Sequence, residues 1–292
     1  MADDTRVAVR RTAKLFVGGA FPRSESGRSY PVHGSNGDLL AHVSQASRKD
    51  ARDAVGAARG AWPGWAARTP YNRGQVLYRV AELMEGRREQ FIEEVRAAEG
   101  GRKRQHVEQV DAAIDRWVWY AGWADKLAQV DGAQNPVAGP YFNFSLPEPT
   151  GVVAVIAPQQ SSLLGLVSVL APVIVTGNTA VVLASAERPL PSISLTEVLA
   201  TSDVPSGVIN LLTGYPAEIA PVLAAHMEVA AIDLSGVAGT DVDPGDLAVA
   251  AAENVKRVRM PADREPDWNR APTPRAMLRF TETKTVWHPI GR

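Results

Sequence analysis

Five short apolar runs alternate with longer helical stretches between residues 151 and 260, and this alternation constrains the fold most strongly. The runs are rich in β-branched residues, too short for helices, and mostly too apolar for strands with one exposed face. They predict parallel strands at residues 151–157, 179–183, 207–212, 229–234 and, with a weaker pattern, 255–260. The stretches between them predict crossover helices at residues 163–175, 190–201, 217–226 and 245–253. The predicted fold class is α/β, with a doubly wound, Rossmann-like parallel sheet.

The preceding part of the chain predicts helices, within residues 47–128, that pack around this sheet. Ser47, followed three residues later by Asp50, resembles a capping box with Asp in place of Glu and marks a helix start. Apolar residues then recur at helical spacing within residues 51–62, 76–84 and 110–127. The last segment contains Trp117, Trp119 and Trp123, whose helical spacing favours core and subunit contacts over a ligand cage.

Composition excludes several classes of function. The 292 residues are 45% hydrophobic and 22% charged, with a formal net charge of -1, as expected for a globular protein of one or two domains. The near-neutral balance gives no basic stripe for nucleic acid, and no apolar window is long enough to span a bilayer. The N-terminal segment places acids before its basic residues and has no apolar signal-peptide region, so we expect a cytoplasmic protein.

The sequence contains no cysteine, which removes disulfides, thiolate metal ligands and thiol nucleophiles together. The five histidines show no spacing typical of a metal site, and no metal is predicted. Ser161 and Ser162 lie between a predicted strand and a predicted helix, but without a G-x-S-x-G pattern. A helix N-cap role is therefore favoured over a nucleophilic one. The G-x-G-x-x-G and Walker A phosphate-binding patterns are also absent.

Segments spread over most of the chain resemble the aldehyde dehydrogenase superfamily and follow one another in the family's order. They are KLFVGG at 14–19 followed by residues 31–34, ARDAVGAARGAWPGW at 51–65, RWVWYAGWAD at 116–125, PEPTGVVAV at 147–155, GNTAVV at 177–182, GVINLLTG at 207–214 and TETKTVW at 281–287. The resemblance implies an NAD-binding-type domain over residues 1–260, with its Rossmann-like core at 151–260. Where the family has its catalytic domain, residues 261–279 are rich in Pro, Arg and Asp and are expected to form a linker.

The resemblance also implies that the family's catalytic groups are lost. The family's proline-tryptophan-asparagine segment, whose asparagine donates to the oxyanion, is matched by Pro158, Gln159 and Gln160. The general-base glutamate is matched by Pro261, which cannot accept a proton. The nucleophilic cysteine would lie in the catalytic domain and has no substitute here.

The positions that would hold a cofactor are equally degenerate. The family's lysine and glutamate for the adenosine ribose are matched by Leu183 and Ala186, or, with a one-residue shift, by Ala184 and Glu187. The serine that meets the pyrophosphate is matched by Val237, after Gly236. Gly214 and the helix N-termini still offer polar contacts. We therefore expect no confident cofactor site, with NAD or NADP binding weak at best.

The family's assembly strands, in contrast, are kept. In the family, a segment before the first Rossmann strand and a strand near the end of the chain form a small sheet that pairs with a neighbouring subunit. Strand-like residues occur near 141–150 and in the tail at 280–292, and the candidate assembly residues are Phe142, Phe144, Phe280, Thr283, Val286 and Trp287. An exposed strand edge favours covering by another chain. The alternative is that the tail only completes the fold of its own chain.

Lost chemistry beside preserved strands predicts a pseudoenzyme. The expected function is that of a non-catalytic structural or regulatory subunit, which assembles with an active full-length aldehyde dehydrogenase or with itself, and not with nucleic acid or a membrane. The alternative is an NAD(P)-binding oxidoreductase of the same family with residual or altered activity. Titration with NAD separates these two hypotheses.

Overall fold

All five predicted parallel strands form one sheet in the computed structural model, which describes residues 12–291. The strand order is β10-β9-β6-β7-β8, and every neighbouring pair is parallel. The first of these strands in the chain, β6, lies in the centre, so the chain winds outward from it in both directions and confirms the doubly wound class. The strands are β6 (Val152–Ile156), β7 (Thr179–Leu183), β8 (Ile209–Leu212), β9 (Val229–Asp233) and β10 (Arg257–Arg259).

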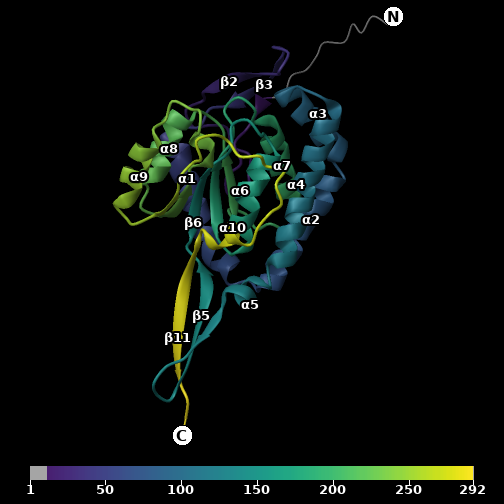
Figure 1. Cartoon of the computed structure of the whole chain (residues 1–292). Helices are drawn as coiled ribbons and strands as arrows, with labels where there is room; N and C mark the ends of the chain where they lie inside the picture. Colours follow the sequence, from purple (N-terminus) through teal and green to yellow (C-terminus); the bar gives the residue numbers. More distant parts are fainter. Residues whose placement is uncertain (1–11, 292) are drawn as a thin grey trace, which may run out of the picture.

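The four predicted crossover helices cover both faces of this sheet. They are α6 (Leu164–Val175), α7 (Leu190–Thr201), α8 (Pro216–Ala225) and α9 (Pro244–Ala252). Helices α6 and α7 lie on one face and α8 and α9 on the other (Figure 1). Every residue of α6 is buried, because this helix lies between the sheet and further helices. Within residues 12–291, no helix is both long and apolar enough to cross a membrane.

The helices of the N-terminal part of the chain form the outer layers. They are α1 (Arg48–Ala66), which lies beside α8, and α2 (Pro70–Glu85), α3 (Arg88–Glu99) and α4 (Lys103–Trp123), which pack around α6 and α7, with the short α5 (Leu127–Asp131) following. The capping box is confirmed, because the Ser47 hydroxyl accepts from the Asp50 N–H and the Asp50 carboxylate accepts from the Ser47 N–H. The three tryptophans of α4 belong to the core, as predicted: Trp117 is fully buried, and Trp119 and Trp123 pack against the core. The separate helix α3 was not predicted.

Two smaller sheets complete the fold. One was not predicted and consists of β1 (Thr12–Ala13), β2 (Ser29–His33) and β3 (Leu39–Ser44). The other contains β4 (Ala133–Asn135), β5 (Tyr141–Pro149) and β11 (Thr281–Pro289) in the order β11-β5-β4. Strand β11 is antiparallel to β5 over nine residue pairs. Figure 1 shows this second sheet, here called the ribbon, extending away from the body of the protein.

Residues 261–279, here called the strap, connect β10 to β11 and are packed against the body rather than extended as a free linker. The strap runs across the α6 side of the molecule (Figure 1) and contains the short helix α10 (Arg275–Leu278). Met277 is buried, and Trp268 and Leu278 pack against the main core. These three apolar side chains anchor a segment whose overall composition is typical of a linker.

A buried amide joins the sheet to the start of the tail strand. The Asn178 side chain lies at the beginning of β7 and is fully buried. Its Oδ1 accepts from the Gly151 N–H at 2.9 Å, and its Nδ2 donates to the Phe280 carbonyl at 2.8 Å. One side chain thus fixes the entry of β6 and the entry of β11 together.

Burial of two tyrosines makes the fold sensitive to alkaline pH. Burial raises the pKa of Tyr120 to about 12, although the nearby Arg116 opposes the shift, and burial also raises the pKa of Tyr30. The unfolded chain therefore loses these protons first as the pH rises above about 10, and each tyrosine then lowers the free energy of unfolding by up to about 1.4 kcal/mol per pH unit. The stability is intact below pH 10 and declines toward the folded-state pKa.

Two of the six tyrosines should accordingly ionise late in a phenolate absorbance titration of the folded protein. Replacing Tyr120 with phenylalanine should remove one late step. Ionisation of all six together near pH 10, with the secondary structure still intact, would contradict this expectation.

Candidate functional site

The loop after β6 is tied to the loop after β7 by Gln159. Its Nε2 donates to the Ala157 carbonyl at 2.7 Å, and its Oε1 accepts from the Ala186 N–H at 3.0 Å. The Ser185 hydroxyl donates to the Gln159 carbonyl at 2.9 Å. The carboxyl ends of parallel strands are where a doubly wound sheet usually binds ligands. Here the amide of Gln159 is used to hold two loops together.

A carboxylate from the strap accepts hydrogen bonds from two backbone amides that precede α6. Glu265 accepts from the Gln160 N–H at 2.9 Å and from the Ser161 N–H at 3.0 Å. The indole N–H of Trp268 also donates to it, at 2.9 Å. Amides at the start of a helix are natural partners for an anion. In this chain the anion is supplied by the protein itself, and a phosphate group at this point would be repelled.

The two serines of the same loop have structural partners. The Ser161 hydroxyl accepts from the Gly165 N–H in the first turn of α6 at 2.9 Å, although the N-cap residue of this helix is Leu163. The Ser162 hydroxyl donates to the Glu99 carboxylate at 2.7 Å and connects the loop to the end of α3. Ser162 is buried, so its oxygen is withdrawn from any substrate.

The four positions matched to the ribose-binding pair differ in their exposure to solvent. Leu183 is fully buried in the apolar core on the α1 and α8 side of the sheet, and Ala184 is buried as well. Ala186 is partly buried, with its N–H bound to Gln159, whereas Glu187 is exposed. Glu187 is the one polar side chain among these four positions that reaches solvent.

The turn after β9 packs directly against the end of β6. Gly236 approaches so closely that an added Cβ would lie 1.8 Å from the Ala157 carbonyl oxygen, so only glycine fits. Val237 is buried in the core. The backbone of this turn therefore lies directly against the end of β6, where the chain changes direction. Gly214, with φ +143°, similarly faces the backbone of Ala46.

Asp233 at the end of β9 was not singled out in the sequence, yet it is the most deeply buried acid there. It forms an ion pair with Arg259 of β10 at 2.7 Å and accepts from the Ser235 N–H at 2.9 Å. Burial lowers the pKa of the neighbouring Arg279, and Arg259 lowers it further. These contacts connect β9, β10 and the end of the strap. No cluster of His, Cys, Asp and Glu within residues 12–291 could hold a metal ion.

The candidate assembly residues separate into two faces of the ribbon and the core. Val286 lies opposite Phe144, on the same face as Phe142, and the rings of Phe142 and Phe144 are in contact. Thr283 and Trp287 lie on the other face, where Trp287 meets Tyr141 edge to face. Phe280 precedes the strand and is buried in the main core, so it cannot form an exposed contact; its assignment to an assembly surface is corrected here.

The aldehyde dehydrogenase family profile matches residues 22–261, and the chain belongs to this family. Retinal dehydrogenase 2 from Homo sapiens is 32% identical over 253 residues, which cover 85% of this chain and 48% of that protein. An aldehyde dehydrogenase from Alternaria alternata is 32% identical over 250 residues, covering 84% and 49%. The structure of an aldehyde dehydrogenase from Bacillus cereus in complex with NAD+ superposes with a TM-score of 0.78 at 26% identity, covering 85% of this chain and 50% of that one.

The chain spans about half the length of the curated relatives it matches. The matched part is the Rossmann-like sheet with its N-terminal helices, as the resemblance implied. The strap, which follows β10 directly, lies almost entirely beyond the matched residues.

Replacing Glu265 with alanine should loosen the strap while the sheet stays folded. The change removes the shared acceptor of two backbone amides and one indole, and each unmade bond costs about 1–3 kcal/mol locally. Trypsin should then cleave within residues 261–279 several-fold faster, and the Gln160 and Ser161 amides should exchange faster with solvent.

The exposed Glu253, which has no hydrogen bond or ion pair within residues 12–291, offers a matched control. Its replacement with alanine changes the net charge equally and should leave cleavage of the strap unchanged. Equal cleavage rates for the Glu265→Ala variant and the parent would show that the carboxylate does not hold the strap.

Proposed function

We propose that this chain is a non-catalytic structural or regulatory member of the aldehyde dehydrogenase family, which assembles with an active full-length relative or with itself. The observation that carries the proposal is the ribbon. Its strands β5 and β11 pair along nine residues, and within residues 12–291 the outer edge of β11 has no neighbouring strand. Unpaired N–H and C=O groups along such an edge are a template for another chain.

One face of the ribbon adds apolar surface to this edge. Phe142 and Leu146 are 41% and 38% exposed, and Phe144 and Val286 are partly exposed beside them. A ribbon of two long strands and one short strand has little stability of its own in water unless its apolar face is covered. Covering this face by another subunit would both bury the aromatic rings and order the strands.

The absence of catalysis is supported by chemistry. Thioester formation needs a thiolate, and the chain has no cysteine. Pro261 stands at the position matched to the family's general-base glutamate, and its side chain has no group that can accept a proton. The chain therefore contributes surface to an assembly and leaves the oxidation of any aldehyde to a partner.

The residues present do not fit a dinucleotide. Leu183 and Val237 are buried carbon side chains at positions expected to be polar, and the Glu265 carboxylate repels phosphate at the start of α6. Each lost polar contact weakens binding by about 1–2 kcal/mol, which together predict no binding at micromolar NAD or NADP. The alternative function, a cofactor-binding oxidoreductase, is supported by the exposed Glu187 at the end of β7.

Native mass spectrometry of the purified chain, alone and co-expressed with a full-length aldehyde dehydrogenase of its own host, tests the assembly proposal. We expect an oligomer of the chain or a mixed complex. A strictly monomeric chain that binds no full-length enzyme would contradict the proposal. Calorimetric titration with NAD and NADP is the separate test of the alternative, and micromolar affinity would establish it.

A further inference from the structure

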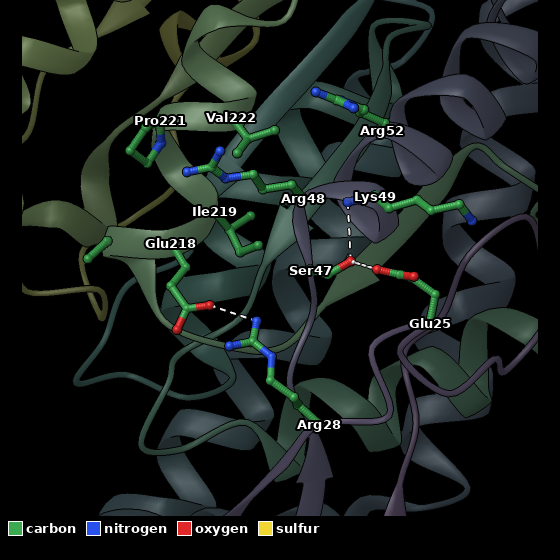
Figure 2. Close-up of a pocket in the computed structure, with 11 residues that line it drawn as sticks. Glu25, Arg28, Ser47, Arg48, Lys49, Arg52, Glu218, Ile219, Pro221 and Val222 are labelled. Atoms are coloured by element: carbon green, nitrogen blue, oxygen red, sulfur yellow. Dashed lines mark hydrogen bonds and ion pairs between the residues drawn. The ribbon is translucent and has the colours of Figure 1, made fainter.

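A cavity of about 620 Å³ lies between the first turns of α1, helix α8 and the loop that precedes β2 (Figure 2). None of its lining residues belongs to the loops that follow β6, β7 or β9. A second cavity of about 500 Å³ is lined in part by the same residues of α1 and α8 and extends to His226 and Met227. Together they form one groove between α1 and α8.

The groove has an excess of positive charge in a chain of net charge -1. Four basic side chains line the first cavity, namely Arg28, Arg48, Lys49 and Arg52, against the two acids Glu25 and Glu218. Both carboxylate oxygens of Glu218 already accept hydrogen bonds, one from Arg28 at 2.9 Å and one from the Gln45 side-chain amide at 2.8 Å. Lys49 pairs with Asp53 at 3.2 Å.

Arg48 and Arg52 differ from the other two basic side chains of the cavity. Both are exposed, and neither has a hydrogen bond or ion pair with any residue in the range 12–291. They are four residues apart on α1 and therefore lie on the same face of the helix, one turn from each other. Figure 2 shows the Arg48 side chain extending toward Val222 and Pro221, whereas Lys49 extends away from them.

Two backbone amides at the start of α1 already have an acceptor. The Lys49 and Asp50 N–H groups donate to the Ser47 hydroxyl, at 3.1 and 3.2 Å. The Ser47 hydroxyl in turn donates to Glu25 at 2.8 Å. An anion in the groove would therefore be held by side chains. The opposite wall is apolar and consists mainly of Ile219, Pro221 and Val222.

We propose that this groove binds a small organic phosphate, with its phosphate group on Arg48 and Arg52 and its apolar portion against Pro221 and Val222. A guanidinium donates in a planar fork that matches two oxygens of a phosphate. Two guanidinium groups one turn apart suit a tetrahedral dianion, whereas a carboxylate would be satisfied by one of them. The apolar wall adds affinity for the organic part. The inference is independent of the assembly role.

Calorimetric titration with phenyl phosphate, inorganic phosphate and benzoate tests the ligand class on the full chain. We expect phenyl phosphate to bind at least several-fold more tightly than either inorganic phosphate, which has no apolar part, or benzoate, which has one negative charge. Its affinity should fall as the salt concentration rises, because exposed charges are screened.

The variant R48A/R52A should bind phenyl phosphate roughly tenfold to a hundredfold more weakly, since two charge-assisted contacts are lost. The variant R48K/R52K keeps the charge but loses the planar fork, and it should bind several-fold more weakly than the parent. The control R79A/R104A removes two exposed arginines of α2 and α4, each paired with a glutamate on its own helix, and should bind as the parent does.

Unchanged affinity in R48A/R52A, or benzoate binding as tightly as phenyl phosphate, would overturn the proposal. Absence of binding by phenyl phosphate in the parent at millimolar concentration would also overturn it. Native mass is the independent readout. We expect R48A/R52A to assemble like the parent, so failure of this inference leaves the assembly proposal unaffected.

Discussion

If the chain assembles through the ribbon as proposed, removal of residues 282–292 is expected to leave it monomeric while the central sheet remains folded. The deletion keeps Phe280 and Thr281, which are buried in the chain's own body, and removes most of the ladder with β5. Covering two large apolar side chains stabilises an interface by about 3–6 kcal/mol, so the association constant should fall by roughly a hundredfold or more. Native mass spectrometry and circular dichroism measure the two outcomes separately.

Point variants test whether the apolar face of the ribbon forms the contact. Val286→Lys places a charge beside Phe144 and Phe142 and should abolish assembly. Thr285→Lys is the matched control, because Thr285 is next to Val286 in the strand and its side chain faces the opposite side of the ribbon. Dissociation by both variants would contradict an interface on one face. An intact oligomer in the deletion variant would show that the ribbon is not the assembly surface.

Replacement of Asn178 with alanine is expected to have the largest effect on stability. The change leaves the Gly151 N–H without its buried acceptor and removes the donor to the Phe280 carbonyl. At about 1–3 kcal/mol for each of these two buried groups, the free energy of unfolding should fall by about 2–6 kcal/mol. Urea denaturation followed by circular dichroism measures this loss.

Thr150→Ala provides the comparison for this position. The Thr150 hydroxyl lies 3.2 Å from both the Asn178 Oδ1 and the Phe280 carbonyl oxygen, so its single proton can be donated to either, but Thr150 is only partly buried. Because Asn178 still donates to the same carbonyl in this variant, the loss should stay near 1 kcal/mol. Equal losses in the two variants would mean that the amide of Asn178 has no special role.

The sheet could be predicted because its information is local. Each strand is a short β-branched run, each crossover helix has a length that fits between two strands, and the Ser47 and Asp50 pair marks the start of α1 in four residues. The same local patterns did not separate α3 from its neighbours and did not reveal the small sheet of β1, β2 and β3.

The candidate sites depended on contacts between distant residues, which no local pattern contains. The composition of residues 261–279 indicates a linker, whereas Glu265 and Trp268 fix that segment to the start of α6. The groove likewise brings Arg28, Arg48 and Glu218 together from separate parts of the chain. Loss of the family's polar cofactor residues could be read from the sequence, but the use of Gln159 to join two loops could not.

The pairing of β5 with β11 also sets an order of events during folding. Register places Pro149 against Thr281 and Tyr141 against Pro289, so β5 must wait for a partner far along the chain. Contacts of such high sequence separation form late, because the closure of a long loop has to precede them. Until then β5 has only the short strand β4 beside it. The ribbon surface that we propose for assembly would thus form after the central parallel sheet. This order favours the association of subunits that are already folded.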